Sequence, residues 1–220
     1  PEVRELSQSQ LRPGARVFNL WAHHGVVALM LAREVGPTGQ VIAVEPIAHN
    51  VHTATTNRDL NEAPHLTILQ ASVAATSGSI RMRDGLQGQA LAGTTQTGGS
   101  FLAEAVTIDD LATRFGTPDV VFIDVEGAEH LALAGATAVL ASGADVFVEL
   151  HVGAGLEALG GSPDEVLAHF PTDRFRLLIR ADDDDTFQAF TPDSPLLQDR
   201  CFLLALSRAP VSVPVHHNLT

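Results

Sequence analysis

The stretch VVFIDVEGAEHLALAGATAVL at residues 120–140, followed by VFVELH at residues 146–151, decides the fold class. Residues 120–124 and 146–151 are apolar runs rich in Val, Ile and Phe, which is typical of buried strands. Residues 129–140 between them have the composition of a helix. A helix that joins two continuously apolar strands is the unit of a parallel sheet with both faces covered, so we expect an α/β fold.

The same alternation of strands and helices extends on both sides of this unit. Further strands are expected at residues 16–20, 41–44, 65–69, 79–83, 174–180 and 202–206, and further helices at residues 26–35, 48–60, 108–115 and 163–170. Thr107 is a candidate N-cap for one helix, and Ser162-Pro163-Asp164-Glu165 opens another with a capping box. The last two strands have no helix between them, which predicts a C-terminal antiparallel hairpin.

The chain is predicted to form a single domain at residues 1–209 with a flexible tail at residues 210–220. Its 220 residues suffice for one large core, and no repeat or change in composition divides them. Residues 85–99 are rich in Gly, Gln and Thr and are predicted to form a long loop. Loops of this length are commonly functional lids or disordered segments.

Composition excludes several classes of protein. A hydrophobic content of 45% argues against disorder over most of the chain, and 26 acidic against 13 basic residues argue against nucleic acid or anionic membranes as partners. No apolar run is long enough for a membrane helix, and residues 1–10 are too polar for a signal peptide. Cys201 is the only cysteine, which excludes an internal disulfide and fits a reducing cytoplasm.

Ligands of doubly wound sheets bind beyond the carboxyl ends of the strands. In this chain those ends are residues 21–25, 45–46, 71–72, 124–127 and 149–151. Three of the five carry a carboxylate, so we expect a polar site at this edge of the sheet.

Glu45 ends the second predicted strand, where Rossmann-type folds place the acid that accepts hydrogen bonds from a ribose. The alternative is a solvated glutamate that leads into a helix. The first loop has a single glycine, Gly25, whereas a dinucleotide needs G-x-G-x-x-G for close approach to its pyrophosphate. NAD and FAD are therefore poor candidates, and S-adenosylmethionine, which has a ribose but no phosphate, fits better.

Four motifs follow one another in the order and spacing of one enzyme family. They are VGPTGQVIAVEP at residues 35–46, VTIDDLA at 106–112, IDVEGAE at 123–129 and VELH at 148–151. Over roughly residues 14–180 the chain resembles the FkbM family of S-adenosylmethionine-dependent methyltransferases. The resemblance implies a Rossmann-like class I methyltransferase fold, with a mostly parallel seven-stranded sheet, helices on both faces and an antiparallel last strand. It also implies S-adenosylmethionine as cofactor and methylation of a hydroxyl on a small molecule, such as a sugar or a secondary metabolite.

The first loop departs from the family's usual D-V-G-A-N-x-G. Asn19 stands at the acid, Trp21 at the first glycine, His23 at the asparagine and Gly25 at the last glycine. The Trp21 indole either walls the cofactor pocket or occludes it. In the second case the chain would be a degenerate methyltransferase fold that serves as a non-catalytic binding or assembly module. The predicted cofactor-binding residues are Asn19, Trp21, Ala22, His23, Gly25, Glu45, Pro46, Ser72 and Asp124.

Methylation of an alcohol requires help with the loss of its proton, because the hydroxyl pKa lies far above 7. His151 is the candidate base, since an imidazole titrates near operating pH. Asp124 and Glu149 are expected either to orient His151 or to bind a divalent cation with it. The alternative is a satisfied, partly buried histidine, with Glu149 and Glu126 only capping adjacent loops and helices. In that case Glu126 and Glu129 complement the start of the following helix. The acceptor, the metal requirement and a homo-oligomeric state stay open.

Overall fold

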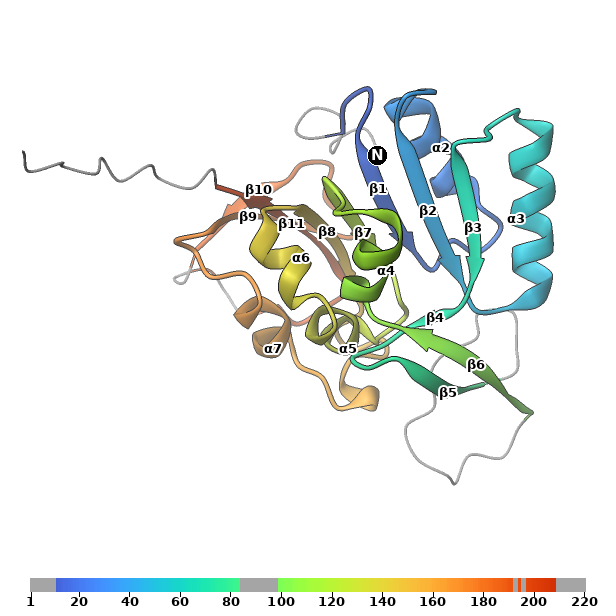
Figure 1. The fold of residues 1–220 in the computed structure, drawn as a ribbon. Coiled ribbons are helices and arrows are strands. Elements are labelled where there is room, and N and C mark those ends of the chain that lie inside the picture. The colour runs from blue at the N-terminus through green and yellow to red at the C-terminus, as the bar shows by residue number, and fades with distance from the viewer. Residues whose placement is uncertain (1–10, 84–98, 192–193, 195–196, 209–220) are drawn as a thin grey trace, which may run out of the picture.

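A mostly parallel sheet of eight strands forms the centre of the molecule (Figure 1). The computed structural model describes residues 11–83, 99–191, 194 and 197–208, so the tail at residues 210–220 and nearly all of the predicted loop at residues 85–99 lie outside the described residues. The strand order is β10-β9-β11-β8-β7-β1-β2-β3. The strands are β1 (Arg16–Leu20), β2 (Gln40–Glu45), β3 (Leu66–Gln70), β7 (Val120–Ile123), β8 (Asp145–Leu150), β9 (Phe175–Ala181), β10 (Gln188–Phe190) and β11 (Cys201–Ser207).

The strand directions confirm the Rossmann-like α/β fold. Strands β1, β2, β3, β7 and β8 pair in parallel, while β11 lies antiparallel between β8 and β9. The expected antiparallel pair of long C-terminal strands is therefore β9 and β11. The three-residue strand β10 pairs antiparallel with β9 and adds an eighth strand at the edge, beyond the seven expected.

Helices cover both faces of the sheet, as expected. They are α2 (Val26–Val35), α3 (Ala48–Leu60), α4 (Ile108–Phe115), α5 (Glu129–Ala134), α6 (Thr137–Ser142), α7 (Pro163–Ala168) and the short 3-10 helix η1 (Glu157–Leu159). Helices α4 to α7 lie in front of the sheet and α2 lies behind it (Figure 1). Side chains alternate between the two cores, because Phe18 and Leu20 pack on the side of α4 to α7 and Val17 packs on the side of α2. None of the described helices combines the length and apolar character needed to cross a bilayer.

The single helix predicted at residues 129–140 is divided into α5 and α6 at Gly135. The Gly135 carbonyl accepts a hydrogen bond from the Asp109 N–H of α4 (2.9 Å). The Asp109 carboxylate in turn accepts bonds from the N–H groups of Ala138 and Val139, both at 2.9 Å, at the start of α6. The Asp109 side chain of α4 therefore caps the start of α6. Composition alone indicates one continuous helix at this place.

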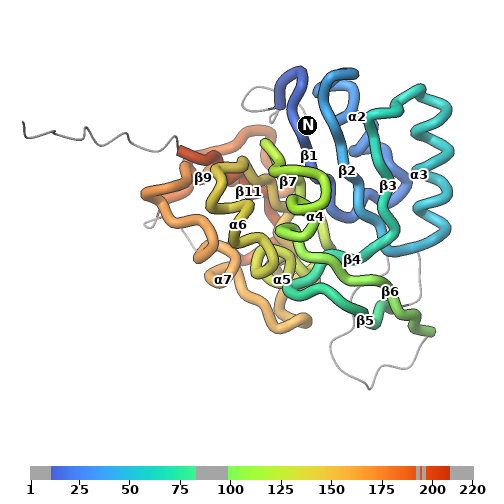
Figure 2. The backbone as a smooth tube through the Cα atoms, in the orientation of Figure 1, coloured from blue at the N-terminus to red at the C-terminus, as the bar shows by residue number. Residues whose placement is uncertain are grey.

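A second, three-stranded sheet lies at the carboxyl ends of β1 to β3 (Figures 1 and 2). It consists of β4 (Ser72–Val73), β5 (Gly78–Arg83) and β6 (Ser100–Val106), in the order β4-β6-β5. Strand β5 corresponds to the strand predicted at residues 79–83, whereas β4 and β6 were not predicted. The small sheet places Ser72 at the same edge of the main sheet as the first loop.

Asp145, at the start of β8, makes the stability of the fold depend on pH. Its side chain is buried, and Oδ1 accepts a hydrogen bond from the Ser207 N–H (2.7 Å). Burial raises the pKa of Asp145 to about 6, although that hydrogen bond and the charge of Arg176 oppose the shift. The folded state therefore holds the proton more tightly than the unfolded chain does. The stabilisation from this proton is present at acid pH and is lost as pH rises through about 6.

Replacement of Asp145 by asparagine is expected to remove this pH dependence. We compare the free energy of unfolding of Asp145→Asn with that of the wild type at each pH. The difference in favour of the variant should be about 3 kcal/mol larger at about pH 8 than at about pH 4. Urea denaturation at several pH values measures this difference. A difference that is the same at every pH would contradict the assignment.

Candidate active site

His151 is held in place by a buried carboxylate. It follows β8 directly, and its side chain is 4% exposed. Its Nδ1 lies 2.7 Å from Oε1 of Glu129, the first residue of α5, and Glu129 is 0% exposed. The same Oε1 accepts a hydrogen bond from the Gly127 N–H (2.9 Å). A carboxylate accepts hydrogen bonds, so Nδ1 carries the proton and the lone pair of a neutral ring lies on Nε2.

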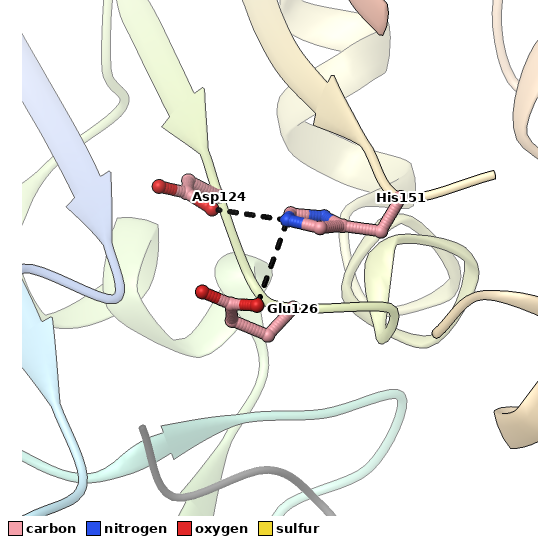
Figure 3. A group of neighbouring side chains, drawn as sticks. All are labelled: Asp124, Glu126 and His151. Atoms are coloured by element: carbon pink, nitrogen blue, oxygen red, sulfur yellow. Dashed lines mark ion pairs between the residues drawn. The ribbon is translucent and has the colours of Figure 1, made fainter. Parts of the chain in front are cut away.

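The second ring nitrogen of His151 faces three further carboxylates. Nε2 lies 3.6 Å from Glu126 Oε2, 3.7 Å from Glu149 Oε1 and 3.9 Å from Asp124 Oδ1. Figure 3 shows Asp124 and Glu126 converging on this nitrogen. All three distances exceed a hydrogen bond. Arg200 Nη1 pairs at 3.0 Å with the same Glu149 Oε1 that faces His151.

Strand register and a tight turn bring these groups together. Ile123 of β7 pairs with Val148 of β8, so Asp124 lies level with Glu149, and His151 projects from the same face as Glu149 two residues later. The chain then turns through Glu126 (φ 51°) and Gly127 (φ 101°) into α5. A Cβ atom on Gly127 would lie 2.5 Å from the carbonyl carbon of Gly155, so the turn packs directly against the loop after β8.

Crowding of carboxylates changes the protonation of the cluster. Burial, followed by repulsion from Glu149, raises the pKa of Asp124 to about 7. Burial also raises the pKa of Glu149. For His151, burial acts to lower the pKa, but the hydrogen bond to Glu129 and the surrounding carboxylates outweigh it and raise the pKa to about 8. The pKa values of Asp124 and His151 thus lie near neutral pH, the range that suits acid–base chemistry.

The first loop keeps the backbone of a glycine-rich loop although it contains large side chains. Trp21 (φ 74°), His23 (φ 49°) and Gly25 (φ 82°) all adopt left-handed conformations. Such a conformation costs a residue other than glycine about 1–2 kcal/mol. The Trp21 indole is 9% exposed and packs in the core shared with Phe18 and Leu20, and burial of this large side chain offsets the strain.

Five of the predicted cofactor residues line one cavity of about 240 Å³ at this edge. They are Asn19, Trp21, Ala22, His23 and Asp124, and the lining is completed by His24, Val26, Val27 and Phe122. Gly25 adjoins the cavity as the N-cap of α2. Pro46 and Ser72 are buried nearby, but neither belongs to the described lining of this cavity. The cavity joins the first loop to Asp124, and hence to the His151 cluster.

Residues 19–177 match the family model of the methyltransferase FkbM domain. The chain belongs to the FkbM methyltransferase family. It is an S-adenosylmethionine-dependent methyltransferase with the fold that the resemblance implied.

Solved methyltransferase structures share the fold of this FkbM-family chain at low sequence identity. A proposed rRNA methylase from Clostridium thermocellum is 14% identical, with 94% of each chain covered and a TM-score of 0.57. The FkbM methyltransferase from Methylobacillus flagellatus KT is 18% identical over 86% of this chain and 43% of that one, with a TM-score of 0.55. Aeropyrum pernix fibrillarin, solved with natively bound S-adenosylmethionine, is 11% identical over 93% and 73% of the two chains, with a TM-score of 0.55. A search of curated protein sequences gave no match.

Asn19 offers an acceptor that suits the amino acid end of S-adenosylmethionine. The side chain is 2% exposed, and no described residue donates a hydrogen bond to its Oδ1. Buried acceptors rarely stay unpaired, and an ammonium group in the adjoining cavity would satisfy this one. Such a bond to the amide would be weaker than one to an aspartate, because the amide carries no charge.

Glu45 already accepts three hydrogen bonds from this FkbM-family chain. Its side chain is 0% exposed, and its oxygens accept from the His23 N–H (2.8 Å), the Ile47 N–H (3.0 Å) and Asn50 Nδ2 (3.1 Å). The carboxylate thus ties the first loop to the start of α3. A carboxylate accepts about four bonds, so at most one acceptor position remains, and a ribose hydroxyl would reach it only if the surrounding chain moved, because the Glu45 side chain is 0% exposed.

We expect Glu45→Gln to destabilise the protein even without cofactor. A glutamine amide offers one acceptor oxygen in place of two, which leaves at least one buried donor unpaired. The free energy of unfolding of the cofactor-free protein should fall by about 1–3 kcal/mol. Thermal or urea denaturation measures this. An unchanged stability, with weaker binding of S-adenosylmethionine, would mean that Glu45 serves the ribose alone.

Glu126 and Glu129 are the site residues that sequence reasoning placed at the start of a helix. The structure puts Glu129 against His151 and Glu126 beside Asp124. Both belong to the IDVEGAE motif, which was the available signal, although the motif does not show which way the side chains point.

Proposed function

We propose that this chain transfers the methyl group of S-adenosylmethionine to a hydroxyl oxygen of a small molecule, such as a sugar or a secondary metabolite. The observation that supports this most strongly is the buried His151 cluster, which adjoins the cofactor loop through Asp124. S-adenosylmethionine, when bound, supplies a methyl group that is already activated for nucleophilic attack. The remaining chemical task is to remove a proton from the acceptor oxygen as it attacks.

The residues of the cluster fit this task. The acceptor oxygen forms a bond to the methyl carbon while the methyl–sulfur bond breaks, and the hydroxyl proton must leave. Glu129 fixes the His151 ring so that Nε2 points toward the open side of the cluster. With its pKa raised to about 8, His151 holds a proton firmly, and the neutral ring that acts as the base becomes the major form above about pH 8.

A larger cavity beside the cluster suits a small acceptor. It has a volume of about 480 Å³, within the range of about 300–1,000 Å³ that is typical of small-molecule sites. Its lining includes the apolar Phe190 and Leu197 and the polar Gln188 and Arg200. Arg200 also pairs with Glu149, so one side chain of the cavity lining contacts a carboxylate of the His151 cluster.

Net charge supports a small molecule rather than a polyanion as acceptor. The formal charge of −13 disfavours phosphate backbones and anionic lipid surfaces.

The free, buried Cys201 is compatible with the reducing cytoplasm that we propose as the compartment.

Two measurements on the same protein test the proposal. Calorimetry should show saturable binding of S-adenosylmethionine and of S-adenosylhomocysteine. Release of S-adenosylhomocysteine should then depend on a hydroxylated acceptor, screened across sugars, polyols and phenolic compounds. Binding without turnover on any acceptor would favour the non-catalytic module. Turnover on thiols or amines, with none on alcohols, would contradict O-methylation.

A further inference from the structure

Three side chains converge at the carboxyl ends of β7 and β8 in an arrangement suited to a metal ion. One potential ligand atom from each of Asp124, Glu126 and His151 lies within 4.8 Å of the other two (Figure 3). The distances from His151 Nε2 are 3.6 Å to Glu126 and 3.9 Å to Asp124. Ligand atoms bound at about 2.0–2.2 Å to one ion lie at most about 4.4 Å apart, so both distances are within this limit.

His151 has the features of a metal ligand prepared in advance. Its side chain is only 4% exposed. Within the described part of the chain, no residue makes a hydrogen bond to Nε2. In the neutral ring the Nδ1 proton points at Glu129, which leaves the lone pair on Nε2, the nitrogen that faces Asp124 and Glu126 (Figure 3). In metalloproteins a ligating histidine commonly donates its other N–H to a carboxylate, which fixes the ring and raises its basicity.

The charge of the cluster favours a cation in the same place. Four carboxylates, those of Asp124, Glu126, Glu129 and Glu149, lie within 3.9 Å of one imidazole. Arg200 pairs with Glu149 at 3.0 Å and shares its charge with Asp182, with which it makes two 2.9 Å contacts. Asp124 Oδ1 is buried and accepts no hydrogen bond from the described residues. A dication would relieve the repulsion and satisfy this oxygen.

We propose that Asp124, Glu126 and His151 bind a divalent metal ion, with Glu129 as the positioning residue for the His151 ring. Two carboxylate oxygens and one imidazole nitrogen suit Mn²⁺, Fe²⁺ or Zn²⁺. The role of the ion rests on the proposed function: an acceptor hydroxyl bound to it would lose its proton more readily, so His151 would act as a ligand rather than as the base. Binding of the ion does not depend on that role.

Titration of the metal-free full chain with Mn²⁺ alone tests the site. Electron paramagnetic resonance of free Mn²⁺ should show one bound ion per chain, and pulsed measurements should show nitrogen modulation from His151. We expect Glu126→Gln and Asp124→Asn to weaken binding by more than about 10–100-fold, the loss typical for a residue that only supports a ligand, and His151→Asn to abolish the nitrogen modulation. Glu129→Gln should weaken binding and alter the nitrogen modulation without abolishing it, whereas a purely structural role would change only the melting temperature.

The matched control is Glu34→Gln, because Glu34 is an exposed glutamate on α2. This variant should bind Mn²⁺ like the wild type. Equal binding by the wild type and Glu126→Gln, or no stoichiometric binding of Mn²⁺ or Zn²⁺ by folded wild type, would overturn the proposal. Release of S-adenosylhomocysteine in the acceptor screen, measured on the same samples, separates the two proposals. Metal binding without methylation of any acceptor would support the metal site and contradict the proposed function.

Discussion

Replacement of His151 by asparagine is expected to lower kcat by about 10²–10⁴-fold, whether Nε2 itself takes the proton of the acceptor or holds the ion that makes this proton more acidic. An asparagine amide can occupy the position of Nδ1 and keep the hydrogen bond to Glu129, but it has no atom at the position of Nε2. The variant therefore removes the reactive nitrogen without leaving Glu129 unpaired. Initial rates of S-adenosylhomocysteine release, at saturating cofactor and with an acceptor identified by the screen, measure the effect.

The affinity for S-adenosylmethionine distinguishes a chemical role of His151 from a structural one. His151→Asn should bind the cofactor with wild-type affinity, because His151 does not line the first-loop cavity. The matched control is His52→Asn, at an exposed position on α3, which should retain full activity. A kcat for His151→Asn within about threefold of the wild type would remove His151 from the chemistry.

Gly127→Ala is expected to lower the free energy of unfolding by about 2–6 kcal/mol, because backbone strain and overpacking each contribute about 1–3 kcal/mol. The φ of 101° disfavours any side chain, and the new Cβ would lie 2.5 Å from the Gly155 backbone. Since the neighbouring atom is backbone, no side-chain rotation relieves the overlap. The movement would also displace Glu126 and Glu129 on either side, so metal or acceptor chemistry should be lost with stability.

Gly160→Ala provides the control for strain without overlap. Gly160 has a similar φ of 85°, but nothing lies within 4 Å of its Cβ position. Its substitution should cost about 1–2 kcal/mol, the amount for a left-handed residue other than glycine. Chemical denaturation of both variants gives the difference, and equal losses would show that the Gly127–Gly155 contact relaxes without energetic consequence.

Much of the fold could be predicted from the sequence because strands buried on both faces must be apolar throughout. The runs at residues 120–124 and 146–151 therefore identify β7 and β8 to within one residue. Strand β10 could not be predicted in this way, because its three residues are not fully buried and are ordered by pairing with β9. The break at Gly135 depends on Asp109, a residue 26 positions earlier whose contact no local pattern reveals.

The site was predictable where it follows strand ends and not where it depends on tertiary contacts. Asp124, Glu149 and His151 are strand-end residues, so the topology alone brings them to one edge. Glu129 was expected to complement the dipole of its helix, as a glutamate in a first turn normally does. Only the approach of His151 from β8 makes it a buried partner. The cofactor-binding roles assigned to residues of the first loop stay predictions. For Trp21 the structure adds a left-handed backbone conformation and a place in the lining of the first-loop cavity.

Trp21 also gives the protein an intrinsic optical signal located at the cofactor loop. The sequence contains one tryptophan and no tyrosine, so absorption near 280 nm and the emission that follows arise almost entirely from this indole. It lines the same cavity as Asn19 and Asp124. Binding of S-adenosylmethionine, a shift of the first loop, or a change of charge at Asp124 would each alter its emission. Ligand screening by fluorescence therefore requires neither a label nor a coupled assay.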